Sequence, residues 1–246
     1  MPRVAVPPAS YSAMVKSRRL AGFAAAVLTA TSMGAPLTAA NATPSPTDQQ
    51  LQEALPSTAD YLRAGFPTPT KVEQLEPPPS RSSHVSICDK HGRRILDLQI
   101  PKSVRVRLPI DAGQAATLSS KRGGTRLSVT WLTRYSTTVN ARRSVRTIRH
   151  RALQCSPVIN SLNKDGPTIH KRQRVQRLPR GGTAITTRYD ASSPVLTYLA
   201  FRRTNNVIAT TYYVDFLPRN RQPASIKPAR KLSKITAKNL AHITTP

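Results

Sequence analysis

The sequence predicts an α+β protein organised around an antiparallel sheet, and residues 195–214 are the clearest sign of that sheet. Residues 195–201 and 207–214 are rich in β-branched and aromatic side chains, with a short polar segment between them. Asn205 and Asn206 in that segment tolerate a positive φ, which favours a tight reversal. Because both arms carry large apolar groups on both faces, we expect this hairpin to lie in the middle of the sheet.

Two further observations support this fold class: a series of strand-like segments before the hairpin, and two amphipathic helices. Strands are expected at residues 95–100, 104–110, 125–135, 169–178 and 184–189. The segment 125–135 alternates apolar and polar side chains most regularly. The last two segments lead directly into the hairpin, so residues 168–214 predict a four-stranded antiparallel meander.

The first amphipathic helix is expected over residues 138–155, where apolar positions ending at Cys155 recur with the helical period. Thr138 or Asn140 can cap its N-terminus. A second stripe beside the apolar one is basic, and it consists of Arg142, Arg146 and Arg149. This stripe is a candidate anion-binding face, and the alternative is a solvated basic surface that keeps the protein soluble.

The second amphipathic helix is expected over residues 228–243, with Pro228 suited to the first turn. Its candidate anion-binding residues are Arg230, Lys231, Lys234 and Lys238. Basic amphipathic helices bind anionic membrane surfaces, so a membrane contact is one interpretation of this helix. Docking of its leucines and isoleucines on the sheet is the other.

The chain ahead of residue 85 is interpreted as a separate N-terminal segment. Residues 48–55 predict a short helix, because two leucines stand one helical turn apart. Residues 67–83 are rich in Pro and Ser and predict extended, irregular chain. We therefore expect a Pro/Ser-rich segment with a short helix over residues 43–84, and the α+β domain with its basic C-terminal helix over residues 85–246.

The first 42 residues have the parts of a secretory signal peptide. The positive region contains Lys16, Arg18 and Arg19. An Ala-rich apolar run follows over residues 20–37, and an A-x-A motif ends at Ala42. A transmembrane anchor is the alternative, but the run is short and contains Gly and Pro. We expect a disordered signal and linker, cleavage between Ala42 and Thr43, and secretion from a Gram-positive-like cell.

The chain has two cysteines, Cys88 and Cys155. In a secreted protein such a pair predicts a single disulfide, and two free buried thiols are the alternative. The bond would close a long loop and stabilise the fold by about 4 kcal/mol in the chain-entropy model. No metal site is expected, because the cysteines are far apart and no nearby Cys/His pair has the spacing of zinc ligands.

The composition is strongly basic, with 38 Lys and Arg against 11 Asp and Glu. Cleavage after Ala42 removes four basic residues and no acidic ones, which lowers the net charge from +27 to +23. A charge of this size attracts polyanions. The polyanions available outside a cell include anionic envelope polymers, anionic membrane surfaces and free nucleic acid.

Catalytic motifs are weak or missing in this sequence. It contains no G-x-S-x-G or H-E-x-x-H pattern, and its S-x-x-K match at residues 161–164 lacks the companion motifs of that mechanism. Asp89, Asp97 and Asp111 are loosely grouped and are interpreted as turn and capping residues. We expect no cofactor and no enzymatic activity.

Three stretches of the chain resemble one known family. They are residues 51–66 (LQEALPSTADYLRAGF), the strand 125–135 with the following NARRSVRTIRHRALQC, and residues 198–213 (YLAFRRTNNVIATTYY). They resemble the opening helix, the strand–helix–Cys unit and the paired strands of the extracellular sensor domain of actinobacterial receptor serine/threonine kinases (PknH-like) and related secreted proteins. The resemblance implies an antiparallel sheet with helices packed on it, and a groove for a ligand.

Three functions follow from these observations. The leading one is a secreted, non-enzymatic binding module that presents a basic surface to anionic material of the cell envelope. An extracellular sensor domain that binds a small molecule or peptide in a groove is the alternative. A secreted enzyme with a non-standard site is the third. The sequence leaves the ligand and the oligomeric state open.

Overall fold

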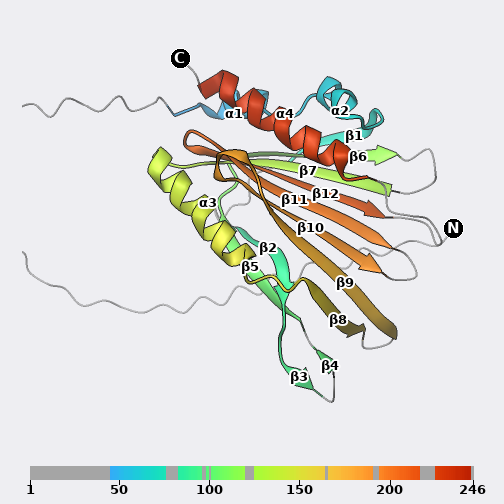
Figure 1. The fold of residues 1–246 in the computed structure, drawn as a ribbon. Coiled ribbons are helices and arrows are strands. Elements are labelled where there is room, and N and C mark those ends of the chain that lie inside the picture. Colours follow the sequence, from blue (N-terminus) through green and yellow to red (C-terminus); the bar gives the residue numbers. More distant parts are fainter. Residues whose placement is uncertain are drawn as a thin grey trace, which may run out of the picture. The chain divides into compact units, whose positions relative to one another are not determined.

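An eight-stranded antiparallel sheet runs through the fold, in the order β1-β6-β7-β12-β11-β10-β9-β8 (Figure 1). The computed structural model describes residues 45–75, 83–95, 98–99, 101–119, 125–163, 166–190, 194–216 and 225–244. The strands of the sheet are β1 (Pro69–Gln74), β6 (Ala112–Ser119), β7 (Thr125–Arg134), β8 (Val158–Asn163), β9 (Gly166–Arg177), β10 (Thr183–Asp190), β11 (Val195–Thr204) and β12 (Val207–Phe216). The predicted α+β class with an antiparallel sheet is confirmed.

The predicted hairpin is formed by β11 and β12, and it lies in the middle of the sheet. The two strands pair in continuous register from Val195↔Phe216 to Thr204↔Val207. Asn205 adopts a φ of 49° at the reversal, and its side-chain amide donates a hydrogen bond to the carbonyl of Thr244. With β9 and β10, the hairpin completes the predicted four-stranded meander.

Each face of the sheet is covered by different elements. One face, here the α3 face, packs against α3 (Thr138–Ala152) and a two-stranded ribbon of β2 (Ser83–Lys90) and β5 (Lys102–Leu108). The other, the α4 face, packs against α1 (Asp48–Glu53), α2 (Thr58–Ala64) and α4 (Lys227–Thr244) (Figure 1). Along β11, Leu199 belongs to the first core and Tyr198 to the second, as the alternation of a strand requires.

The fold begins earlier than residue 85, which corrects the expectation for the N-terminal segment. Within the stretch expected to be irregular, β1 pairs with β6 at the edge of the sheet. Pro69 is the first residue of β1, and proline is tolerated at that position of an edge strand. The predicted short helix is present as α1, which buries Leu51, while Tyr61 and Phe66 pack in the core beside α4.

Several boundaries also differ from the sequence prediction. The strand expected at residues 95–100 is not one continuous strand, because β3 (Arg94–Ile95) pairs with β4 (Leu98–Gln99); residues 96, 97 and 100 lie outside the described residues. The strands β6 and β8 were not predicted, because β6 is rich in small residues of low strand propensity and β8 is a short edge strand. The N-cap of α3 is Thr137, whose hydroxyl accepts the N–H of Asn140 at 3.1 Å, in place of Thr138 or Asn140.

Candidate functional site

A cleft opens where the turn end of the β11–β12 hairpin meets α4 and the 3-10 turn η1 (Pro179–Gly181). Its volume is about 350 Å³. Basic side chains from three separate parts of the chain line it, namely Arg180, Arg202, Arg203, Lys234 and Lys238. The other lining residues are Pro179, Thr204, Ala237 and Ala241, and none of them is acidic. We call this feature the basic cleft.

The side of the basic cleft formed by α4 is determined by helical spacing. Lys234 and Lys238 stand four residues apart and therefore share one exposed face of the helix. The hydroxyl of Thr204 donates a hydrogen bond to the carbonyl of Ala237 at 3.3 Å, which holds α4 against the end of β11. Like charges at this spacing repel each other, so the helix itself does not favour the two lysines.

Arg202 forms the half-buried floor of the basic cleft. Its Nε donates a hydrogen bond to the hydroxyl of Ser233 at 2.8 Å, which fixes the guanidinium against α4. Burial lowers the pKa of Arg202, and the nearby Tyr198 acts in the opposite direction. Among the described residues, no carboxylate forms a salt bridge with any of the five basic residues of the cleft.

Arg203 connects the basic cleft to α3. Its guanidinium donates a hydrogen bond to the carbonyl of Asn205 at 3.1 Å. Burial lowers the pKa of Arg203, and the positive charge of Arg142 lowers it further. The start of the predicted basic stripe on α3 therefore lies within electrostatic range of the cleft.

Arg180 is held in the cleft wall by an unusual turn. It adopts a φ of 56° and the following Gly181 a φ of 80°, both in the left-handed region that favours glycine. Gly182 follows, and a Cβ at that position would lie 2.7 Å from the carbonyl oxygen of Phe201. The turn therefore packs directly on β11, and Arg180 occupies a strained position within it.

The structure brings some of the predicted anion-binding residues together and leaves others apart. Lys234 and Lys238 line the basic cleft, with Arg142 nearby. Arg149 lines a second groove with Arg177, and Arg230 donates a hydrogen bond to the side chain of Gln176 at 2.7 Å. The remaining two candidates, Arg146 and Lys231, are exposed on their helices.

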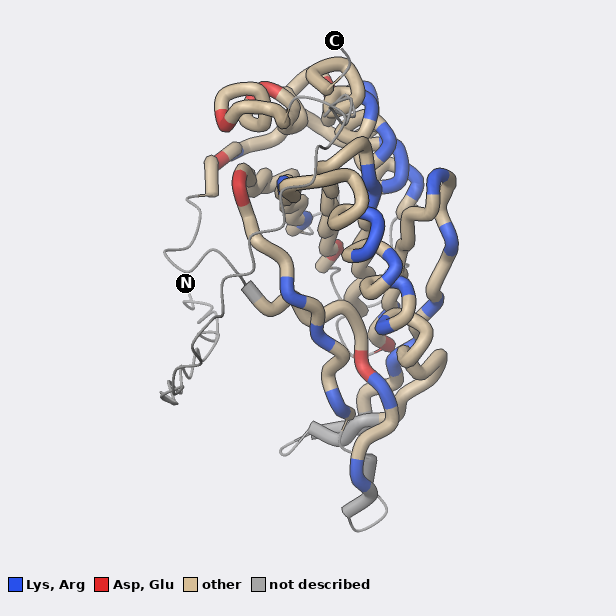
Figure 2. Tube along the Cα trace, turned by 90° about the vertical axis from the view of Figure 1, so that its left-hand side faces the viewer, with Lys and Arg blue, Asp and Glu red and all other residues tan. Residues whose placement is uncertain are grey.

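Sequence reasoning missed three of the five cleft residues. These are Arg180, Arg202 and Arg203, which lie in or beside turns and were interpreted as loop residues. The sequence feature that could have identified them is that each is a basic residue in or beside a turn, and that these turns face the basic side of an amphipathic helix. Figure 2 shows that Lys and Arg positions form a run down one side of the view, while most acidic positions lie elsewhere.

The apolar side of α4 is not available for a membrane. Leu232 and Leu240 are fully buried, in the core of the α4 face. Of the two interpretations of this helix, docking on the sheet is therefore the one that the structure shows. In the described part of the chain, no helix is both long and apolar enough to cross a membrane.

The predicted disulfide is confirmed. Cys88 of β2 and Cys155, just after α3, are bonded with a Cα–Cα distance of 5.7 Å.

Two of the three loosely grouped aspartates have structural partners: Asp89 pairs with the ammonium of Lys171 at 2.9 Å, and Asp111 accepts the N–H of Arg134 at 2.6 Å. Asp97 lies outside the described residues, as do the signal peptide and the cleavage site between Ala42 and Thr43.

No group of His, Cys, Asp and Glu among the described residues has a geometry suited to a metal ion. The S-x-x-K match ends at Lys164, which also lies outside the described residues.

No protein-family model matches the chain, and no curated protein matches it either. Two solved structures match this chain, both with low sequence identity. The extracellular domain of PknH from Mycobacterium tuberculosis matches with a TM-score of 0.49 and 11% identity, over 80% of this chain and 98% of that chain. An uncharacterised protein from Mycobacterium smegmatis, the Rv0999 ortholog, matches with a TM-score of 0.36 and 8% identity, over 83% and 100%. The first belongs to the PknH-like family that the sequence resembles.

Proposed function

We propose that this protein is a secreted, non-enzymatic binding module that holds an anionic polymer of the cell envelope in the basic cleft. One observation carries the proposal. Five basic side chains from three parts of the chain line a cleft of about 350 Å³ to which no acidic residue contributes. A solvated surface that serves solubility does not require charges to be gathered in a concave site.

The electrostatics of the basic cleft favour an anion. Arg202 is half-buried beside other cations, and its charge has no carboxylate partner among the described residues. A phosphate or carboxylate placed there would accept charge-assisted hydrogen bonds and relieve the repulsion between neighbouring cations. Binding should therefore weaken steeply as salt screens these charges.

Binding suits the chemistry of the cleft better than catalysis. Arginine and lysine side chains donate hydrogen bonds and have no acceptor, so they are suited to holding an anionic ligand. The disulfide supports an extracellular location, because such bonds persist in oxidising compartments.

The test is the binding of the chain from Thr43 onwards to a poly(glycerol phosphate) polymer, with neutral dextran as the control glycan. We expect saturable binding to the phosphate polymer that falls with salt, and none to dextran. The double variant Lys234→Glu/Lys238→Glu should reduce the affinity at low salt by at least about tenfold, or about 1.4 kcal/mol.

A matched control is available on the same helix. Lys227 and Lys231 are exposed, have the same four-residue spacing and lie outside the cleft. Lys227→Glu/Lys231→Glu changes the net charge by the same amount, so an equal loss of affinity in both double variants would show general charge attraction and would reject the cleft as the site.

A further inference from the structure

A second cavity lies on the α3 face of the sheet, beneath β2. Its volume is about 190 Å³. We call it the β2 pocket. Its wall on the β2 side contains residues Ser86 to Asp89, and its floor contains side chains of β9, β10, β11 and β12. It does not share any lining residue with the basic cleft.

The floor of the β2 pocket carries four hydroxyl groups, which belong to Thr187, Tyr189, Thr197 and Tyr212. Tyr212 and Tyr189 are close enough to interact electrostatically, and burial raises the pKa of both phenols. In the described part of the chain, none of the four hydroxyls donates or accepts a hydrogen bond. None of the four is among the buried polar atoms without a partner, so water reaches them, and a ligand that enters the pocket must replace that water with hydrogen bonds of its own.

The charged groups at the pocket, in contrast, are already neutralised within the protein. The carboxylate of Asp89 pairs with Lys171 at 2.9 Å, and the ammonium of Lys171 also lies 5.1 Å from the centre of the Tyr189 ring. Ile87, Ile185 and Leu199 add apolar surface. The pocket therefore offers free hydroxyls and apolar contact, but no unpaired charge among the described residues.

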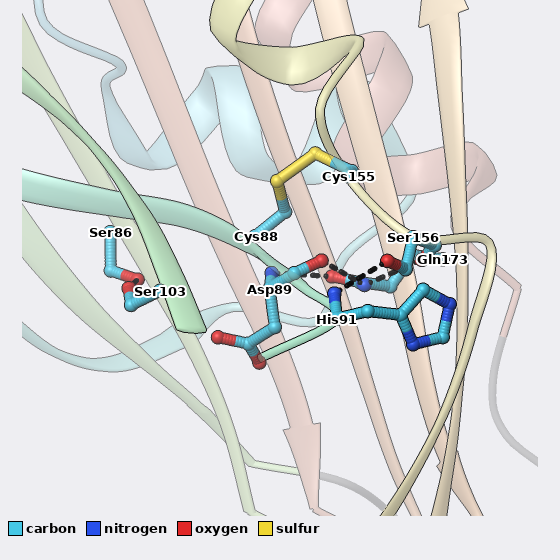
Figure 3. The surroundings of a disulfide bond; sticks show 8 residues. All are labelled: Ser86, Cys88, Asp89, His91, Ser103, Cys155, Ser156 and Gln173. Carbon is cyan, nitrogen blue, oxygen red and sulfur yellow. Dashed lines mark hydrogen bonds between the residues drawn. A yellow bond between two sulfur atoms is a disulfide. The ribbon is translucent and has the colours of Figure 1, made fainter. Parts of the chain in front are cut away.

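The β2 side of the pocket is fixed in place by covalent and hydrogen bonds (Figure 3). The disulfide joins Cys88 to Cys155. The side chain of Gln173 accepts the N–H of Asp89 at 3.1 Å and donates to the carbonyls of Asp89 and Ser156 at 2.9 and 2.8 Å. These contacts connect β2 to the floor strand β9, so the pocket exists before any ligand binds.

We infer that the β2 pocket binds a neutral small molecule that carries several hydroxyl groups, in size and chemistry one sugar ring. Hydroxyls both donate and accept, so the ligand's own hydroxyls can pair with the four on the floor in several arrangements. The apolar side chains match the C–H face of such a ring. An anion finds no cation to bind here, because Lys171 is already paired.

The test uses the protein labelled with ¹³C at isoleucine and leucine methyl groups. It is titrated with glucose, N-acetylglucosamine and myo-inositol, and with glucuronate as a charged analogue. We expect saturable shifts of the Ile185 and Leu199 methyl signals with at least one neutral compound. If none of the neutral compounds shifts these signals, or if glucuronate binds more tightly than glucose, the inference is wrong.

Two variants and a control separate binding from structure. Tyr212→Phe and Thr197→Val should each weaken binding by about tenfold, which is the loss of one good hydrogen bond, without lowering the melting temperature. Tyr135→Phe should lower the melting temperature and leave binding unchanged, because its hydroxyl pairs with Ser144 at 2.6 Å and lies outside the pocket. Equal destabilisation by Tyr212→Phe would mean that its hydroxyl already has a partner in the protein and would overturn the inference.

Discussion

The basic cleft and the β2 pocket are both lined by residues of strand β11, but they differ in whether their charged side chains have partners. Thr197 and Leu199 of β11 line the pocket, whereas Arg202 and Arg203, at the end of the same strand, line the cleft. In the pocket, Asp89 and Lys171 neutralise each other and hydroxyls are left without partners. In the cleft, no described carboxylate pairs with the cations. The kind of ligand that a cavity favours therefore depends on which groups the fold leaves unpaired, and the net charge of the chain does not reveal it.

The largest expected effect comes from removing the disulfide. Cys88→Ala/Cys155→Ala should lower the free energy of unfolding by about 4 kcal/mol, since the bond closes a loop of 67 residues. Denaturant titration measures this loss. Under conditions where the variant is folded, it should lose ligand binding in the β2 pocket but keep polyanion binding, because the bond holds β2 and does not touch α4. Simultaneous loss of both activities would contradict the independence of the two cavities.

Gly182→Ala should have the opposite effect on the two cavities: it should weaken binding in the basic cleft and leave the β2 pocket unchanged. Its Cβ would approach the Phe201 carbonyl to 2.7 Å, so η1 must move away from β11, at a cost of about 1–3 kcal/mol. We expect weaker polyanion binding and an unchanged β2 pocket, measured by salt-dependent binding and by the Leu199 methyl signal. Unchanged affinity for the polymer would show that the position of η1 is not important for the cleft.

Acidification should weaken the contact between α2 and α4, in which Asn239 donates a hydrogen bond to Asp60. Asp60 is buried in α2; burial by itself raises its pKa, but hydrogen bonds from Ser57 and Asn239 and the charge of Arg63 outweigh this, so the pKa of Asp60 is lowered. A lowered pKa in the folded state means that Asp60 stabilises the protein above its ordinary value near 3.8, and that this contribution is lost as pH falls through the lowered value.

Asp60→Asn tests this contribution. It should cost about 1–2 kcal/mol at neutral pH and flatten the acid limb of the stability curve. Thermal unfolding between pH 2 and pH 7, in about half-unit steps, compares the variant with the unchanged protein. Identical pH dependence of the two proteins would assign the acid sensitivity to other carboxylates.

The smallest effect is expected from Arg180→Gly, which should raise stability slightly and weaken polymer binding. Glycine relieves the left-handed strain at φ 56°, so the melting temperature should rise slightly, by up to about 1 kcal/mol in stability. Loss of one cation should weaken polymer binding several-fold. Stronger or equal binding would remove Arg180 from the cleft's function.

Local patterns in the sequence identified the elements that are strong by themselves. The hairpin of β11 and β12, the meander and both long helices were predicted because β-branched runs and helical periodicity act over a few residues. The strands β1 and β6 were not predicted. The segment around β1 is rich in proline and β6 is rich in small residues, so both have low strand propensity and are stabilised by pairing with neighbouring strands. The disulfide prediction needed only the count of two cysteines in a chain expected to be secreted.

The candidate sites also contain residues that local patterns predict and residues that only long-range packing brings together. Lys234 and Lys238 were identified because helical spacing places basic residues on one face. Arg180, Arg202 and Arg203 were missed, because residues far apart in the chain become neighbours only when β11 packs against η1 and α4. The β2 pocket has no sequence signature, since threonine and tyrosine in a strand are most often ordinary sheet residues.

The sequence by itself determined the fold class, the disulfide partners and the excess of positive charge, because composition and short-range periodicity encode them directly. The tertiary structure decided which of those charges, and which hydroxyls, have no partner among the described residues. Those properties depend on which side chains meet across the sheet, and this is fixed by long-range packing rather than by any local pattern.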